Sequence, residues 1–186
     1  MRLDFPELGR IRAERADLPP PDAGLLGRLA ALRHVALLDS AAGGRFTVVG
    51  ALPLARFLWR PGRAEVLLPG GPRARGDDFA AALRAALRAT TSDAPSPLPY
   101  GPGRMGCLGY GLRREFERVP ERHPDWCGMA DVDLAYYPAV AVHDAEEGAW
   151  WLVWRRDCAD TGRALRGWLG QRAQPPTGRV AGRAST

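Results

Sequence analysis

The stretch Asp131–Trp154, DVDLAYYPAVAVHDAEEGAWWLVW, contains three consecutive runs with the length and composition of β-strands. The runs are Asp131–Tyr137, Ala139–Asp144 and Ala149–Trp154, and they are rich in valine, tyrosine and tryptophan, which favour extended structure. Two glutamates and a glycine at 146–148 separate the last two runs and are typical of a hairpin turn. The stretch therefore predicts three strands, of which the last two form a hairpin.

The third run, AWWLVW, alternates in a way that assigns its tryptophans to the core. Trp150, Leu152 and Trp154 fall on one face of the strand, whereas Trp151 and Val153 fall on the other. Apolar side chains on both faces are typical of a strand that is covered on both sides. This interpretation is favoured over the alternative, a platform on which the bases of a single-stranded nucleic acid stack.

Further strands are predicted upstream of this stretch. His34–Asp39 and Arg45–Ala51 flank a double glycine and form either a hairpin or a pair of neighbouring strands. Ala55–Arg60 and Arg63–Leu68 flank a Pro-Gly dipeptide that suits a second hairpin. Met105–Tyr110, a strand punctuated by glycines, follows a loop of serine, proline and glycine at 90–103.

Four segments have helical periodicity or capping signals. They are Ala23–Leu32, a helix capped by Asp77 or Asp78 that runs to Ala89, Leu112–Arg118, and Asp160–Arg172. Because these helices do not alternate strictly with the strands, the order of elements favours an α+β fold over a doubly wound parallel sheet. We therefore predict largely antiparallel β-sheet layers with a few packed helices.

The organisation predicted for the 186 residues is one domain with two irregular ends. Residues 1–23 contain four prolines and scattered charges, and they are predicted to be an irregular lead-in. The domain itself is expected over 24–172. Residues 173–186 have no apolar periodicity and are predicted to be a disordered tail.

Composition excludes several classes of protein. The net charge is +5, but all 26 basic residues are arginines spread along the chain, which indicates a bias of composition rather than a nucleic-acid-binding face. There is no apolar run long enough for a membrane helix, and the three cysteines form no CxxC pair. We expect a cytoplasmic protein with reduced thiols that binds neither nucleic acid nor membrane.

The sequence contains no common catalytic motif. Walker, GxGxxG, HExxH and GxSxG patterns are absent from it. Cys107 has no neighbouring base in the sequence, so a buried structural thiol is favoured over a nucleophile. His123 and Cys127 stand four apart, but Pro124 disfavours the helical turn that a shared metal would need. We predict no catalytic residue and no metal ligand in this chain.

Three segments together resemble the N-terminal domain of component I of anthranilate synthase and of aminodeoxychorismate synthase. They are LLDS with the RF and VVGALP that follow it (37–53), LPYGPGRMGCLGYGLRREFERVPE (98–121) and DVDLAYYPAVAVHDAEEGAWWLV (131–153). Their order and spacing match along roughly residues 30–155. The run Leu112–Glu121 is more similar to the aminodeoxychorismate, or para-aminobenzoate, branch than to the anthranilate branch.

The resemblance implies a role in chorismate utilisation, for folate or for tryptophan biosynthesis. In this family a longer C-terminal domain holds chorismate and magnesium, and a glutamine amidotransferase subunit delivers ammonia. We expect that catalytic domain to be absent from this chain and encoded separately. The chain is then non-catalytic by itself and contains no cofactor, and it supports the catalytic domain structurally.

The resemblance also implies a tryptophan pocket. The positions that match it are Leu38, Asp39, Ser40, Arg45 and Phe46. Carboxylate, hydroxyl and backbone carbonyl groups at a strand end suit an ammonium group, and Leu38 and Phe46 suit an indole ring. Arg45 suits either a carboxylate or the face of a ring. The alternative is structural, because Asp-Ser is also a common turn former.

Two other functions stay open at the level of the sequence: an independent tryptophan-binding module, and an inactive truncated remnant. Docking on a catalytic domain predicts a large apolar sheet face that is exposed in the isolated chain. One departure from the family pattern lies in the glycine-rich segment, where Gly111 replaces the acid that usually follows the tyrosine.

Overall fold

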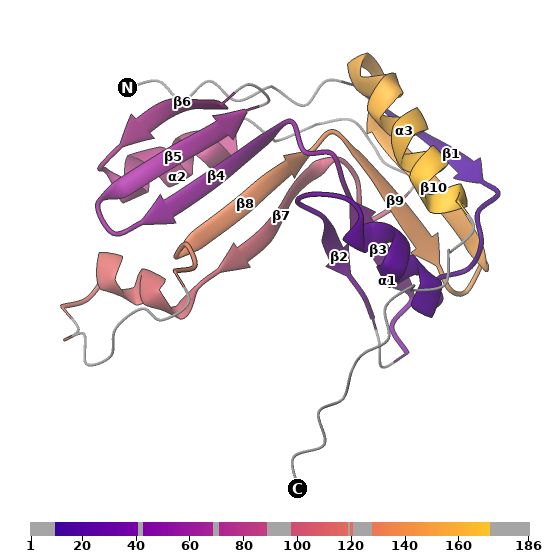
Figure 1. Cartoon of the computed structure of the whole chain (residues 1–186), viewed down its shortest axis with the longest axis horizontal. Helices are drawn as coiled ribbons and strands as arrows, with labels where there is room; N and C mark the ends of the chain where they lie inside the picture. Colours follow the sequence, from indigo (N-terminus) through magenta and orange to yellow (C-terminus); the bar gives the residue numbers. More distant parts are fainter. Residues whose placement is uncertain are drawn as a thin grey trace, which may run out of the picture.

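A computed structural model describes residues 10–40, 43–68, 71–88, 98–118, 120 and 128–171. Within this part of the chain, ten strands form two five-stranded antiparallel sheets (Figure 1). The first sheet has the order β1 (Ile11–Ala16), β10 (Ala149–Arg155), β9 (Ala139–Asp144), β3 (Phe46–Gly50) and β2 (Ala36–Leu38). The second has the order β6 (Gly71–Gly76), β5 (Arg63–Leu68), β4 (Ala55–Arg60), β8 (Val132–Tyr137) and β7 (Gly103–Leu108).

Two crossings of the chain join the sheets into an arch. Pro138 alone separates β8 of the second sheet from β9 of the first, and its carbonyl accepts a hydrogen bond from the Arg155 N–H at 2.9 Å. The other crossing links β3 to β4, where the Leu54 N–H donates to the Tyr136 carbonyl at 2.9 Å. The sheets therefore diverge from a shared corner, and their inner faces look toward each other beneath it (Figure 1).

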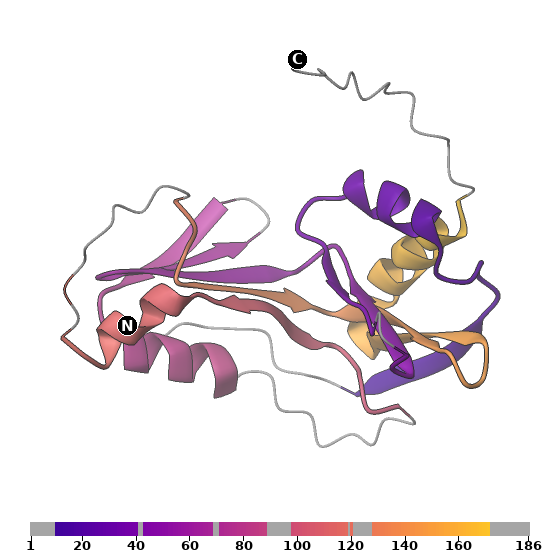
Figure 2. The same ribbon diagram turned by 90° about the horizontal axis from the view of Figure 1, so that it is seen from below.

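Helices cover the outer faces of the arch. On the first sheet, α1 (Ala23–Ala30) and α3 (Ala159–Gly170) bury an apolar cluster that includes Leu25, Trp150 and Leu165. On the second sheet, α2 (Phe79–Arg88) covers Phe57 and Trp59. Two 3₁₀ helices, η1 (Tyr110–Glu115) and η2 (Arg156–Cys158), follow strand ends. Figure 2 shows the helices of the two sheets set apart from each other.

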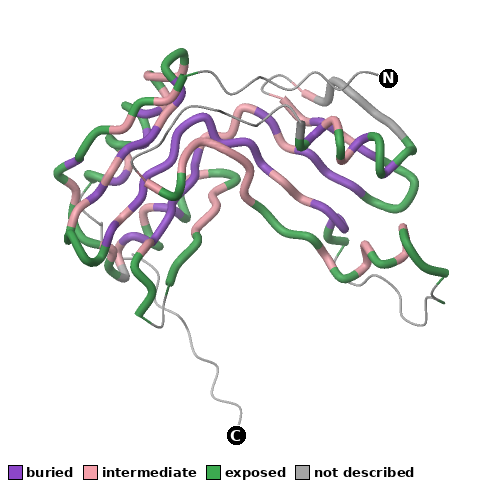
Figure 3. The backbone as a smooth tube through the Cα atoms, turned by 180° about the vertical axis from the view of Figure 1, so that it is seen from behind, coloured by how far each residue is buried: buried purple, intermediate pink, exposed green. Residues whose placement is uncertain are grey.

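A third cluster lies where the inner faces meet at the corner. It contains Val48, Tyr137, Val140, Val142 and Val153, and Figure 3 shows buried backbone running through the bend. Each sheet is thus covered by helices on one face and partly by the other sheet on its second face. No helix of the described residues is long and apolar enough to cross a membrane.

The predicted fold class is confirmed, and most predicted strands appear with their expected partners. β4 and β5 pair as the predicted hairpin, as do β9 and β10, and β2 pairs directly with β3. The tryptophans of β10 divide as predicted: Trp150 packs beneath the helices, and Trp151 packs on the inner face. Asp78, rather than Asp77, caps α2, because its carboxylate accepts the Ala81 N–H at 2.9 Å.

The predicted lead-in over 1–23 is wrong for residues 11–16, which form β1. This strand pairs with β10 along its whole length, from Ile11 opposite Arg155 to Ala16 opposite Trp150. Its sequence, IRAERA, is half polar because it is an edge strand with much of its length exposed. β6 was also missed, since glycine, proline and arginine are poor strand signals. The predicted disordered tail at 173–186 lies outside the described residues.

Candidate functional site

The five residues predicted to form a tryptophan pocket lie together at one end of the β2–β3 hairpin. Leu38 is the last residue of β2, and Asp39 and Ser40 follow it. Arg45 directly precedes β3, and Phe46 is its first residue. Antiparallel pairing of Leu38 with Val48 brings the two groups side by side. All five are exposed or half-buried, so the fold gathers them at a surface.

Hydrogen bonds within the hairpin already use the polar side chains of this group. The Ser40 hydroxyl donates to the Phe46 carbonyl at 2.9 Å, and the Thr47 hydroxyl donates to Asp39 Oδ1 at 2.9 Å. The Ser40 carbonyl accepts the N–H groups of Gly43 and Gly44, both at 3.2 Å. Asp39 and Ser40 therefore hold the turn together, as the structural interpretation of an Asp-Ser pair requires.

Arg45 is paired with a carboxylate of its own chain. Its Nε and one terminal nitrogen donate to the two oxygens of Asp144 at 2.9 and 2.7 Å, and Glu146 lies 2.7 Å from the other nitrogen. The Asp144 side chain is completely buried, and the backbone N–H of Glu146 also donates to it at 3.0 Å. The guanidinium stands 4.9 Å from the centre of the Phe46 ring. Arg45 therefore contacts both a carboxylate and a ring.

This pair is expected to make stability depend on pH. Hydrogen bonding from Arg45 holds the pKa of Asp144 below its usual range, so the pair stabilises the fold above the ordinary carboxyl pKa of about 4. That contribution is lost as the pH falls through the lowered pKa. Arg45→Met should therefore lower the melting temperature at pH 7, and its difference from the wild type should shrink between pH 4 and pH 2.

Arg15→Met is the matched control for this measurement. Arg15 of β1 lies 3.4 Å from Glu147, which is in the same β9–β10 turn as Glu146. Both side chains are exposed, and exposed ion pairs contribute little to stability. Its melting curve should follow the wild type at each pH. Equal losses for the two variants, or a loss in Arg45→Met that does not change with pH, would contradict the assignment.

A second group of residues surrounds a cavity of about 370 Å³ beneath the arch. Its walls come from β2 and the residues before it, and from the inner face of the second sheet. The lining residues are His34, Val35, Ala36, Leu37, Leu38, Arg56, Met105, Gly106, Cys107, Asp133, Ala135 and Tyr137. Leu38 is the one residue that this cavity shares with the predicted tryptophan pocket.

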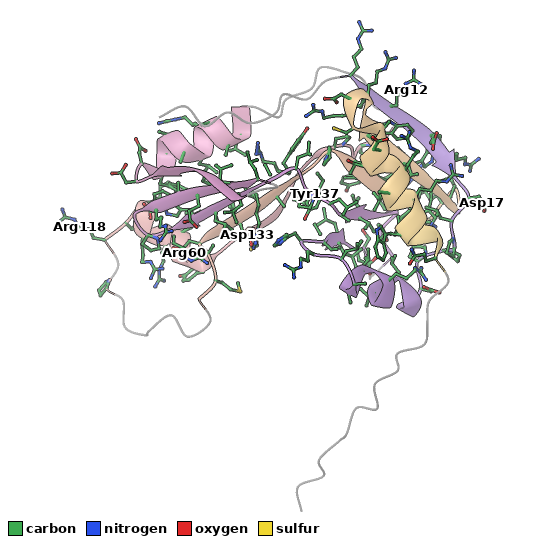
Figure 4. The ribbon with its side chains drawn as sticks, turned by 45° about the horizontal axis from the view of Figure 1, so that its top comes forward. Arg12, Asp17, Arg60, Arg118, Asp133 and Tyr137 are labelled. Carbon is green, nitrogen blue, oxygen red and sulfur yellow. The ribbon has the colours of Figure 1, made fainter. Side chains whose placement is uncertain are left out.

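An ion pair forms the polar part of this cavity. Arg56 Nε donates to Asp133 Oδ1 at 2.6 Å, and a terminal nitrogen of Arg56 donates to the other oxygen. The remaining terminal nitrogen lies 3.3 Å from His34 Nδ1, and the Tyr137 hydroxyl donates to the His34 carbonyl at 2.8 Å. Burial, with the nearby Asp133 carboxylate, raises the pKa of Tyr137 to about 12, so its hydroxyl stays protonated. Figure 4 shows Tyr137 at the bend and Asp133 further along β8.

The sequence did not single out Arg56 or Asp133. They are 77 positions apart, and they meet because β4 and β8 are neighbours and both side chains point to the inner face.

Cys107 was predicted to be a buried structural thiol, and this is wrong: it lies on β7, which is an edge strand, and it is exposed. His123 and Cys127 lie outside the described residues. Among those described, no three His, Cys, Asp or Glu side chains are grouped to hold a metal.

Two glycines of the glycine-rich segment, Gly106 and Gly111, lie where a side chain would not fit. A Cβ at Gly106 would lie 1.8 Å from the Asp133 carbonyl oxygen, so β7 packs against β8 more closely than a side chain allows. A Cβ at Gly111 would lie 2.0 Å from an oxygen of the Asp131 carboxylate, which pairs with Arg114 at 3.2 Å. The Asp131 carboxylate therefore fills the space beside position 111 and leaves no room there for a side chain.

The inner face of the second sheet is mixed and not the large apolar face expected for docking, because charged pairs lie on it beside Leu58, Leu67 and Met105. The pairs Arg56–Asp133 and Arg63–Glu65 lie on it. Large apolar side chains are exposed instead at the far end of that sheet. Four of them, each more than 60% exposed, lie in or beside η1: Leu108, Tyr110, Phe116 and Met129.

Two crossing antiparallel sheets with helices on their outer faces define an α+β protein of the kind found in component I of anthranilate synthase. The solved structure of that protein from Streptococcus pneumoniae matches with a TM-score of 0.54 at 18% identity, covering 83% of this chain and 37% of that chain. No protein-family model matches the sequence.

Sequence comparison points to the same proteins. The chain is 30% identical to anthranilate synthase component 1 of Thermus thermophilus over 181 residues, which cover 93% of this chain and 38% of that protein. It is 24% identical to aminodeoxychorismate synthase component 1 of Bacillus subtilis over 122 residues, 65% of this chain and 26% of that protein. The resemblance to component I of these two synthases is confirmed, and the chain spans between about a quarter and two fifths of these relatives.

Proposed function

We propose that the chain is the N-terminal, non-catalytic part of a component I-type synthase that uses chorismate, of the aminodeoxychorismate or the anthranilate branch. The observation that carries the proposal is the extent of the likeness to Thermus thermophilus anthranilate synthase component 1. It covers 93% of this chain but 38% of that protein. The chain thus corresponds to one part of a larger enzyme, and its role is to support a chorismate-binding catalytic domain.

The exposed apolar end of the second sheet supports this role. Leu108, Tyr110, Phe116 and Met129 lie in or beside η1, and exposed apolar patches mark interaction sites. Arg60 and Arg118 are exposed near the same end (Figure 4). We propose that the catalytic domain docks here, with a glutamine amidotransferase subunit in the complete assembly. We propose that magnesium, which the family resemblance implies, is held by the catalytic domain rather than by this chain.

Amino-acid binding is the second part of the proposal. Leu38, Asp39, Ser40, Arg45 and Phe46 stay a predicted tryptophan pocket, and the structure supports it by placing them side by side at the surface. An amino acid bound beside β2 would let the concentration of a pathway's end product act on the catalytic domain that this chain supports.

A chimera tests the supporting role. This chain replaces the matching part of Bacillus subtilis aminodeoxychorismate synthase component 1, and the chimera is expressed in a bacterium that lacks its own component I. We expect growth without para-aminobenzoate, because the tethered chain takes the structural place of the part that it replaces. The same enzyme with that part deleted should give no growth. A chimera that is soluble and folded, yet rescues no better than the deletion, would overturn the proposal.

A further inference from the structure

A second cavity, of about 450 Å³, opens beside the β3–β4 crossing. Its walls come from the α1–β2 connection at 31–34, from the crossing at 52–54, and from the start of β4 with the end of β5. It shares His34 and Arg56 with the cavity beneath the arch, but no residue of β2, β7 or β8 lines it. Its volume falls within the range of roughly 300 to 1,000 Å³ that is typical of small-molecule sites.

Hydrogen bonds to β8 hold two of these walls in place. The Tyr137 hydroxyl donates to the His34 carbonyl at 2.8 Å, and the Leu54 N–H donates to the Tyr136 carbonyl at 2.9 Å. In the described part of the chain, the non-glycine residues with positive φ are His34 at 55° and Leu52 at 57°, and both line this cavity. Such backbone costs free energy and persists only where the surrounding structure imposes it. The cavity is therefore preformed.

Most of the wall surface is apolar. Five leucines line the cavity, and each of them is half-buried, so part of their apolar surface is left in contact with water. They are Leu32, Leu52, Leu54, Leu67 and Leu68. A ligand with an apolar body would remove this surface from water, and that removal favours binding.

The charged and titratable groups of the walls are all basic. Arg33, His34 and Arg56 line the cavity, and none of its lining residues is acidic. Arg56 is paired with Asp133, whereas no carboxylate pairs with Arg33 among the described residues. Because Arg56 can only donate to His34 Nδ1, 3.3 Å away, a neutral His34 has its proton on Nε2 and offers an N–H donor. The polar part of the walls therefore suits an anion.

We propose that this cavity binds a monocarboxylate with an apolar body, with the carboxylate on Arg33 and His34 and the body against the five leucines. An amino acid is a poorer ligand, because the walls offer its ammonium group basic side chains and no carboxylate. The site differs from the predicted tryptophan pocket at the β2–β3 hairpin in its position and in the charge that it selects. It does not depend on the chain's being part of a synthase.

Calorimetry with phenylacetate and octanoate tests the ligand class. We expect at least one of them to bind the folded wild type, and the tighter of the two shows whether the body is aromatic or aliphatic. The matching amide, which lacks the charge, should bind at least tenfold more weakly. L-Phenylalanine at the same concentration should not displace the bound carboxylate. The proposal is overturned if neither carboxylate binds at millimolar concentration, if the amide binds as tightly, or if L-phenylalanine competes.

Two neighbouring alanines test the position. Ala31 lines the cavity, whereas Ala30, the last residue of α1, is exposed and does not line it. Ala31→Trp should weaken binding of the carboxylate at least tenfold, because the indole fills the space. Ala30→Trp should leave the affinity within twofold of the wild type. If both variants keep the wild-type affinity, the carboxylate binds elsewhere and the assignment is wrong.

Two arginines keep the test valid if Ala31→Trp does not fold. Arg33→Gln removes the charge with little change in size and should weaken binding at least tenfold. Arg12→Gln makes the same change at an exposed position of β1, the outer strand at the opposite edge of the first sheet from β2 (Figure 4). It should not alter the affinity. If Arg33→Gln binds the carboxylate as the wild type does, Arg33 does not hold it and the proposal fails.

The outcome is independent of the supporting role, which is judged by rescue of growth with the chimera. If the carboxylate binds as described but the chimera fails, this inference stands and the supporting role falls. If the chimera rescues growth but neither carboxylate binds, the supporting role stands and this inference falls.

Discussion

Gly106→Ala is expected to lower the free energy of unfolding by about 3 kcal/mol, at the upper end of what an inserted methyl group costs. The added Cβ would lie 1.8 Å from the Asp133 carbonyl oxygen and 2.8 Å from its carbonyl carbon. Both are backbone atoms of β8, so no side chain can rotate away to relieve the contact. β7 must instead move off β8, which weakens the pairing that runs from Gly103 to Leu108. Urea unfolding followed by circular dichroism measures the loss.

Gly103→Ala is the matched control, because it makes the same change at the start of the same strand. A Cβ at Gly103 has nothing closer than the Gly101 carbonyl oxygen at 3.8 Å, which is an ordinary contact. Its stability should stay within about 0.5 kcal/mol of the wild type, as at most surface positions. If both variants lose the same amount, the close approach to β8 is not the reason that glycine is needed at 106.

Sequence patterns predict the strands whose side chains are apolar and miss those whose side chains are not. β4, β5, β9 and β10 were all expected within a residue or two of their bounds, because each buries apolar side chains and each hairpin has its turn residues. β1 and β6 are outer strands of the two sheets. Their sequences, IRAERA and GPRARG, lack period-2 hydrophobicity, whereas the outer strands β2 and β7 keep enough apolar residues to be predicted.

The two groups of site residues differ in the same way. Leu38 to Phe46 are near in the sequence, and one turn brings them together, so a local motif is enough to predict their proximity. Arg56 and Asp133 meet only through the register of β4 on β8, and a shift of one residue would send Asp133 to the helix-covered face. Cys107 was misjudged for a related reason: its burial depends on whether a strand lies beyond β7, which its own sequence does not reveal.

Trp59→Ala is expected to cost about 4 kcal/mol of unfolding free energy, within the range of about 3 to 5 kcal/mol for removing a buried large aromatic side chain. Trp59 is completely buried in the core of the second sheet, and its ring lies 5.1 Å from that of Phe79 on α2. Its indole N–H donates to Glu115 Oε1 at 2.7 Å, which fastens η1 to the sheet. The substitution therefore opens a cavity beneath α2 and also releases η1.

Two comparisons separate these effects, because Trp59→Phe keeps most of the packing but lacks the N–H donor. It should cost about 1 to 2 kcal/mol, the sum of a lost hydrogen bond and a small cavity. Tyr110→Ala removes an aromatic ring that is 80% exposed in η1 and should cost less than about 1 kcal/mol, chiefly its contact with Arg113 at 4.4 Å. Hydrogen exchange at the amides of η1 should accelerate in both Trp59 variants. If it accelerates only in Trp59→Ala, packing and not the bond to Glu115 holds η1, and with it the proposed docking end, in place.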